Sequence, residues 1–101
     1  MNEKRGLPEL TEEQVEKLCE VAEEAARKHI LSKIPIRKIS DFDITVEVES
    51  LKPLNVIVDV NLELSPLMRN YDAKKLAEEA VEKAFNAVDN YLRDISCKSK
   101  G

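Results

Sequence analysis

Apolar residues recur at helical spacing in the first third of the chain. Residues 11–14 (Thr-Glu-Glu-Gln) form a capping box, a motif in which the first and last side chains each bond the other residue's backbone amide. Over residues 15–30 the apolar positions follow at steps of three and four, with charged residues mostly on the opposite face. This pattern predicts an amphipathic helix over about residues 12–31.

The central part of the chain alternates apolar and polar residues with the period of a strand. Apolar residues occupy the even positions of 42–48 and again those of 54–64, while the odd positions are mostly acidic or amide residues. Each run therefore has one apolar face and one polar face. The two runs predict a pair of half-buried strands joined as an antiparallel hairpin.

The same alternation fixes the register of the hairpin. The apolar positions share a face when Val48 lies opposite Val56, which leaves a three-residue loop at 51–53. A register slipped by two residues would instead set Asp43 opposite Asp59. We therefore expect the first register.

A second apolar stripe at helical spacing covers the last third of the chain. Asp72 precedes it and is a good N-cap residue, because its carboxylate can accept a bond from a backbone amide of the first turn. The stripe continues regularly to Ile95. We expect this helix to be a main core element and the polar tail, residues 96–101, to be frayed.

The predicted order is helix, strand, strand, helix, in a single domain spanning residues 1–101 with an ordered core of about 8–95. Short connections reverse each element, which predicts an α+β fold: a two-layer α-β-β-α sandwich, with an antiparallel hairpin covered on one face by two antiparallel helices. Two strands are only about 10 Å wide, whereas two helices need about 20 Å. We therefore expect the sheet to be extended by dimerisation through the outer edge of the 54–64 strand, or by a short edge strand at 34–39. Pro35 also allows the latter segment to be a linker.

Length and composition exclude several classes of protein. The 101 residues carry a net charge of -4, and no apolar run approaches the about 20 residues of a membrane span. The first ten residues lack the apolar centre of a signal peptide, so we expect a cytoplasmic protein with no membrane partner. Abundant Glu and Lys with a single Gln are typical of thermophilic proteins. Cys19 and Cys97 are too few for a disulfide framework, and their expected places on the helices are too far apart for a bridge.

Residues that could carry chemistry are scarce. The two glycines, Gly6 and Gly101, leave no phosphate-binding loop or dinucleotide fingerprint, and His29 is a single histidine in an alanine-rich stripe. We therefore expect no enzyme, no catalytic residue, no cofactor and no small-molecule substrate. The polar face of the hairpin is acidic but has no loop to wrap a cation, so we expect a solvated face without metal, or one that receives a basic partner. Its acidic residues are Asp43, Glu47, Glu49, Asp59 and Glu63.

Positive charge gathers in one segment, residues 27–38, which contains no acidic residue. Its basic residues are Arg27, Lys28, Lys33, Arg37 and Lys38. Two interpretations remain open: the first two stabilise the negative end of the helix dipole while the others are solvated, or all five form a binding patch for RNA phosphates or an acidic protein. The segment contains no aromatic residue that could stack on a base, so RNA binding here would be weak and independent of sequence.

Residues 34–49 (Ile-Pro-Ile-Arg-Lys-Ile-Ser-Asp-Phe-Asp-Ile-Thr-Val-Glu-Val-Glu), with the 56–64 strand and the 76–92 helix, resemble a small archaeal family of proteins of unknown function. The resemblance covers about residues 8–95 and rests on hydrophobic patterns. It implies an archaeal, cytoplasmic α+β protein whose gene often lies near that of the prefoldin beta subunit, and it supplies no catalytic residue. We expect a non-enzymatic interaction module, a homodimer acting near the translation or protein-folding machinery. The alternative is a weak, sequence-independent RNA-binding protein that uses residues 27–38.

Overall fold

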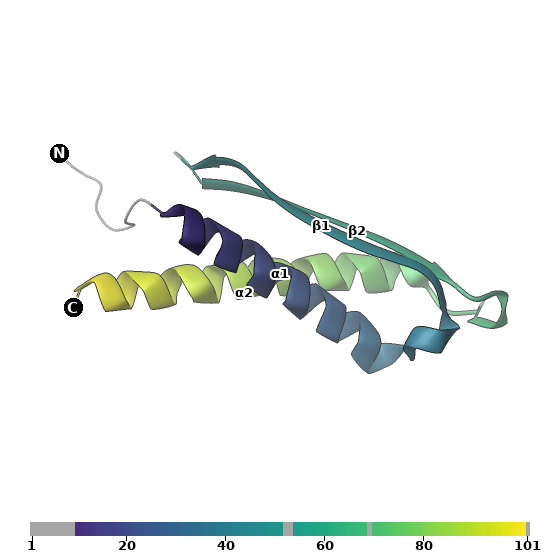
Figure 1. The fold of residues 1–101 in the computed structure, drawn as a ribbon. Helices are drawn as coiled ribbons and strands as arrows, with labels where there is room; N and C mark the ends of the chain where they lie inside the picture. The colour runs from purple at the N-terminus through teal and green to yellow at the C-terminus, as the bar shows by residue number, and fades with distance from the viewer. Residues whose placement is uncertain (1–9, 52–53, 69, 101) are drawn as a thin grey trace.

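The chain folds into two layers, a β-hairpin above a pair of helices (Figure 1). The computed structural model describes residues 10–51, 54–68 and 70–100. The elements in chain order are α1 (Glu12–Lys33), the 3-10 turn η1 (Ile36–Lys38), β1 (Ile39–Leu51), β2 (Leu54–Leu64), the 3-10 turn η2 (Pro66–Met68) and α2 (Ala73–Lys100). This order confirms the predicted α-β-β-α sandwich.

Helix α1 begins at the predicted capping box. The Gln14 amide donates to Thr11 Oγ1 (3.1 Å), and the Thr11 amide donates to Gln14 Oε1 (3.0 Å). The helix runs two residues past its expected end, because Ile34 still donates its N–H to the Ile30 carbonyl while its own backbone is extended. Residues 8 and 9, the start of the expected ordered core, lie outside the described part of the chain.

Of the two interpretations of residues 34–39, the linker is confirmed and the edge strand is wrong. Ile34 is fully buried as the C-cap of α1, η1 follows, and Ile39 is already the first residue of β1. The Lys38 amide donates to the Pro35 carbonyl (2.9 Å) and closes the turn. Since the Ile34 side chain is held in the helix layer, the chain has to turn at once to reach the sheet and has no length left for a separate strand. Within the described residues the sheet therefore has two strands.

The two strands pair in the predicted register. Val48 lies opposite Val56, and the pairs further from the hairpin tip keep this register down to Phe42 with Leu62. After Val48 the register shifts by one and Leu51 pairs with residue 54, so the prediction of a three-residue loop is wrong. Such a bulge inserts one extra residue into one strand. Ser50, a polar residue at an even position, marks the point where the apolar alternation breaks.

Helix α2 begins at the predicted N-cap, where the Lys75 amide donates to Asp72 Oδ1 (3.1 Å). Its backbone is helical to Lys100, five residues beyond the last apolar position of the predicted stripe. The helix can continue because neither Gly nor Pro occurs between Asp72 and Lys100 to stop it. That the tail, residues 96–101, is frayed stays a prediction. Gly101 lies outside the described residues.

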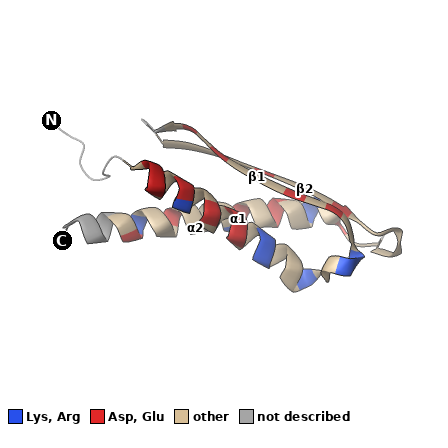
Figure 2. Cartoon of the chain, viewed as in Figure 1, with Lys and Arg blue, Asp and Glu red and all other residues tan. Residues whose placement is uncertain are grey.

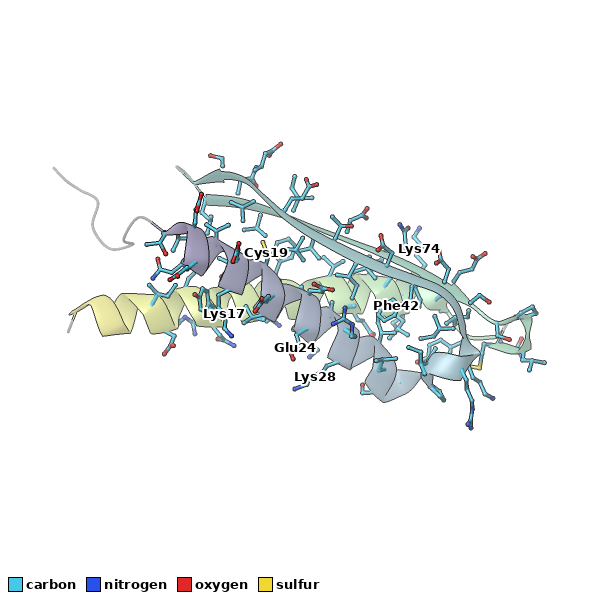
Figure 3. The ribbon with its side chains drawn as sticks, in the orientation of Figure 1. Lys17, Cys19, Glu24, Lys28, Phe42 and Lys74 are labelled. Atoms are coloured by element: carbon cyan, nitrogen blue, oxygen red, sulfur yellow. The ribbon has the colours of Figure 1, made fainter. Side chains whose placement is uncertain are left out.

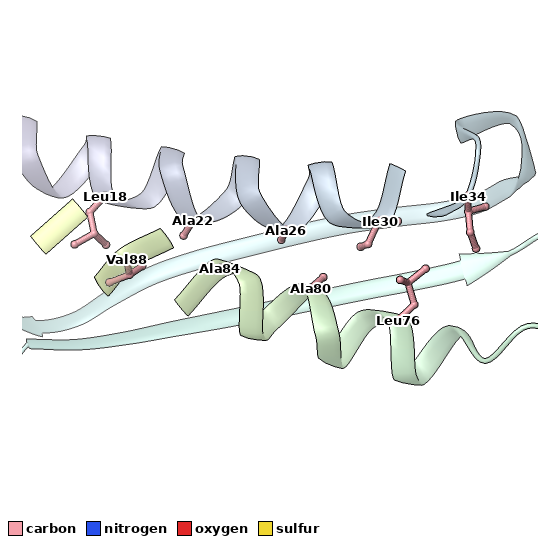
Figure 4. Close-up of a cluster of buried hydrophobic side chains, with 9 residues drawn as sticks. All are labelled: Leu18, Ala22, Ala26, Ile30, Ile34, Leu76, Ala80, Ala84 and Val88. Carbon is pink, nitrogen blue, oxygen red and sulfur yellow. The ribbon is translucent and has the colours of Figure 1, made fainter. Parts of the chain in front are cut away.

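The core lies between the two helices and under the sheet (Figure 4). It consists of Leu18, Ala22, Ala26, Ile30, Ile34, Leu76, Ala80, Ala84 and Val88. The alanines, two from each helix, allow the helix axes to approach closely. Helix α1 packs beneath β1 and α2 beneath β2. Because a sheet of two strands is narrow, its inward apolar residues remain half-buried.

Candidate interaction surface

The two 3-10 turns lie at the same end of the sheet, here named the turn end (Figure 1). The turn end comprises residues 33–38, 65–68 and 70–72. The last pair of the strand ladder is Ile39 with Leu64. Just beyond this pair the Ser65 amide donates to the Lys38 carbonyl (2.9 Å). One backbone bond therefore ties η1 to the residue that precedes η2, and the two turns present their side chains at one end of the molecule.

Three large apolar side chains are exposed at the turn end. The exposed fraction is 66% for Ile36, 85% for Leu67 and 40% for Tyr71. Hydrogen bonds fix η2, since the Leu67 amide donates to Ser65 Oγ (3.2 Å) and the Met68 amide donates to the Ser65 carbonyl (2.8 Å). Each of the two aliphatic side chains directly follows a proline, whose fixed φ restricts the turn further. These Pro-Ile and Pro-Leu dipeptides are the sequence signal for a surface that the apolar periodicity does not reveal.

The structure divides the predicted basic patch in two (Figure 2). Lys33 and Arg37 are exposed at the turn end, and Lys38 is half-buried there. Arg27 and Lys28 lie more than one turn earlier in α1, where Arg27 forms an ion pair with the glutamate one turn before it. Figure 3 shows Lys28 pointing away from the sheet. Three of the five predicted residues therefore share the turn end with exposed apolar side chains, and two do not.

An open hollow of about 370 Å³ adjoins the turn end. Its lining residues are Lys33, Asn70, Tyr71, Asp72, Lys75, Leu76 and Glu79. The two ammonium groups are balanced by two carboxylates, and Asp72 is already engaged as the N-cap of α2. Tyr71 and Lys33 both line this hollow, although they are far apart in the sequence.

The single histidine connects the two helices. His29 Nε2 lies 3.0 Å from Glu79 Oε1, and the His29 side chain is only 14% exposed. This hydrogen bond is the main cause that lowers the pKa of the Glu79 carboxyl, with smaller contributions from the charges of His29, Lys75 and Lys33. The contact gives His29 a structural role, as expected for a histidine in an alanine-rich stripe.

The outward face of the sheet is acidic, as predicted. Its carboxylates are Asp41, Asp43, Glu47, Glu49, Asp59 and Glu63, and neither strand contains Lys or Arg. Asp41 lies directly opposite Glu63, close to the turn end. At the other end, Glu49 accepts a bond from Asn55 Nδ2 (2.6 Å). Among the described residues, no three ligating side chains come together as a metal ion would require. The absence of metal binding stays a prediction, which a titration can test.

Cys19 lies between α1 and the sheet (Figure 3). Its thiol is free, in line with the expectation of no bridge to Cys97, whose side chain lies outside the described residues. Burial raises the pKa of the Cys19 thiol. The thiolate, which is the reactive form, is therefore disfavoured at neutral pH.

Comparison with known proteins gives the family. The sequence profile of a family described as "Protein of unknown function (DUF3194)" matches residues 7–91. The chain belongs to the DUF3194 family. An uncharacterized protein of Thermococcus kodakarensis is 36% identical over 91 residues, which cover 90% of this chain and 83% of the relative. A second uncharacterized relative, from Pyrococcus furiosus, is 31% identical over 90% of this chain and 81% of its own. The expected resemblance to an archaeal family of unknown function is thereby confirmed.

Two solved structures share the fold of this DUF3194 protein. A crystal structure from Thermococcus onnurineus matches with a TM-score of 0.76 and 32% identity, covering 93% of this chain and 90% of that one. The solution structure of a hypothetical protein from Methanothermobacter thermautotrophicus matches with a TM-score of 0.72 and 28% identity, covering 89% and 97%. Within the described residues, neither helix combines the length and apolarity needed to cross a membrane.

Proposed function

We propose that this DUF3194 protein is a non-enzymatic interaction module whose partner-binding surface is the turn end. One observation carries the proposal: Ile36 and Leu67, the most exposed of the large apolar side chains described, share one end of the molecule with Lys33 and Arg37. Exposed apolar side chains with a polar rim are typical of binding surfaces. The charge of this end contrasts with that of the sheet, whose strands carry carboxylates and no Lys or Arg.

The titratable groups support a role without catalysis. No polar or charged side chain is buried among those that the structure describes. Catalytic acids and bases usually acquire perturbed pKa values through burial and close charges. Here the lowered pKa of Glu79 is explained mainly by its hydrogen bond to His29 between the helices. A place near the translation or protein-folding machinery rests on the family resemblance, which implies a gene near that of the prefoldin beta subunit.

Affinity purification from an archaeal lysate tests this proposal. Tagged wild type is compared with Ile36→Ser/Leu67→Ser, and with Phe85→Ser, which removes an exposed apolar side chain from α2 instead. Lysates are used with and without RNase, and both protein and RNA are identified. We expect wild type and Phe85→Ser to retain a protein of the translation or folding machinery and the double variant to lose it. Equal retention by all three proteins would contradict a binding role for the turn end.

We also propose that the module is a homodimer. Within the described residues each strand has one neighbour, so β1 and β2 both leave an edge unpaired. Neither strand contains the Pro or Lys residues that usually protect such edges. The outward face carries four carboxylates on β1 and two on β2, so two β2 edges repel each other less. Because a helix is wider than a strand, α2 obstructs the edge of β2 wherever the two lie close together. Figure 1 shows the hairpin tip diverging from α2. The tip half of β2, residues 54–58, is therefore the accessible pairing edge.

Light scattering at high micromolar concentration tests the homodimer. We expect about twice the monomer mass of 11.5 kDa for wild type. Antiparallel pairing centred on Val56 would set Ile57 opposite Asn55 of the second copy, so Asn55→Lys/Ile57→Lys should return the protein to monomer by placing lysines opposite each other. Thr45→Lys, on the outward face of β1, is the matched control and should stay dimeric. A monomeric wild type would end the homodimer proposal.

RNA binding through the 27–38 segment is the second candidate function. The observation that favours it is that Tyr71 and Lys33 line the same hollow, since an aromatic ring together with a cation can bind a base and its phosphate. Filter binding at ~150 mM salt should then retain RNA of any sequence, and Lys33→Ser/Arg37→Ser/Lys38→Ser should lower both affinity and salt dependence. Equal retention by wild type and the triple variant removes this candidate.

A further inference from the structure

We infer that the turn end receives a short protein segment that carries both acidic and apolar side chains. This inference deepens the proposed function by naming the chemistry of the partner. It rests on three properties of the surface: two exposed aliphatic side chains on hydrogen-bonded turns, three basic residues at the same end, and an acidic sheet that begins immediately next to them.

The aliphatic side chains require an apolar counterpart. Ile36 and Leu67 are exposed to 66% and 85%, whereas the inward apolar residues of the sheet are at most half-exposed. Burying such side chains against another apolar surface stabilises a complex by about 25 cal/mol for each Å² removed from water. The phosphates and sugars of a nucleic acid offer little apolar surface to them. A protein side chain does.

The turns are already ordered, so binding loses little conformational entropy. In η1 the Lys38 amide donates to the Pro35 carbonyl, and in η2 the Leu67 and Met68 amides donate to Ser65. Prolines fix φ at the residue before η1 and at the first residue of η2. A surface held in its bound shape binds more tightly than a flexible one of the same area.

The charges specify acidic side chains and limit the size of the partner. Lys33 and Arg37 are exposed and Lys38 is half-buried at this end, which favours carboxylates in the partner. Asp41 and Glu63, however, lie opposite each other within two residues of the last ladder pair. A long anionic surface, such as an RNA strand or a charged bilayer, would extend over these carboxylates and be repelled. A segment of a few residues can contact the basic side chains without reaching these two carboxylates.

A nuclear magnetic resonance titration with defined probes tests this inference. The main probe is a twelve-residue peptide with four glutamates and three leucines. Two control peptides replace either the leucines by serine or the glutamates by glutamine, and the other probes are a twelve-nucleotide oligouridine and vesicles containing one third phosphatidylglycerol. We expect the mixed peptide to bind at least tenfold more tightly than any other probe, with shifts confined to the turn end. Ile36→Ser/Leu67→Ser should weaken it at least tenfold, and Phe85→Ser, which removes an exposed side chain from α2, should not change it.

Each other outcome overturns the inference. If the serine-substituted peptide binds as tightly as the mixed one, the aliphatic side chains contribute nothing. If oligouridine or vesicles bind more tightly than the mixed peptide, with affinity lost in Lys33→Ser/Arg37→Ser/Lys38→Ser, the surface recognises negative charge alone. If no probe binds while the lysate experiment still yields a partner lost in Ile36→Ser/Leu67→Ser, this inference fails and the proposed function stands. If neither experiment detects binding at the turn end, both fail.

Discussion

Replacing Ile30 by alanine should be among the most damaging single changes in this protein. The Ile30 side chain is fully buried between the helices, where its core neighbours include alanines from α1 and α2. Ile→Ala substitutions in cores cost about 2–5 kcal/mol, and the cost rises with the volume of the cavity left behind. Alanine neighbours have no side-chain torsion that could fill the space. We therefore expect a loss of about 3–4 kcal/mol in the free energy of unfolding.

Ile36→Ala is the matched control, because it removes the same atoms from a side chain that is 66% exposed. Its effect should stay within about 0.5 kcal/mol. Urea titration followed by helix circular dichroism measures both variants, and an unchanged m-value would show that the denatured states are alike. In thermal melts Ile30→Ala should lower Tm by about 12–30 °C, since 1 kcal/mol corresponds to about 4–8 °C in a domain of this size. A cost for Ile30→Ala no larger than that for Ile36→Ala would refute the assignment of the core to the helix interface.

Three further predictions concern a cap, an ion pair and a metal. Thr11→Ala breaks the capping box and should cost about 1 kcal/mol in urea titration, while Thr11→Ser should cost little. The pKa of Glu79 is lowered in the fold, so its bond to His29 contributes stability above the unfolded glutamate pKa and is lost as pH falls through the lowered value. Urea titrations should show wild type losing its advantage over Glu79→Gln below about pH 5, and a constant difference would contradict this. Calorimetry should find Mg²⁺ or Ca²⁺ binding to the acidic sheet no tighter than millimolar; a micromolar constant abolished by Glu47→Gln or Asp59→Asn would overturn that expectation.

The helices and the strand register could be predicted because local rules determine them. Residues 11–14 contain both partners of the capping box, and the period of two allows only registers that keep the apolar residues on one face. The charges then select between those registers. The bulge after Val48 could not be predicted with the same rule, because it changes the parity of the pairing. Only the polar Ser50 at an apolar position hinted at it.

Periodicity and capping patterns could not predict the exposed surface at the turn end. Ile36 lies in a run with Ile34 and Ile39 that has the composition of a strand, and its exposure depends on where the buried Ile34 anchors the chain. Tyr71 directly precedes the N-cap of α2, and its 40% exposure at the hollow that Lys33 also lines is not visible in the sequence. The division of the basic segment also needed the structure. Only the ion pair of Arg27 with the glutamate four residues earlier follows from helical spacing alone.

The two-stranded ladder has a consequence for the exchange of backbone hydrogens. In an antiparallel pair, half of the amides point to the partner strand and the others point outward. Along β1 and β2 the outward amides exchange with water unless another chain adds a strand. Deuterium should therefore replace the amide hydrogens of alternate residues quickly and those of the residues between them slowly. The exchange rates along the hairpin then reveal whether another chain pairs with it. A chain that pairs with β2 would slow the exchange of the outward amides of β2 over one contiguous stretch. A partner bound at the turn end would leave the alternation of fast and slow exchange unchanged.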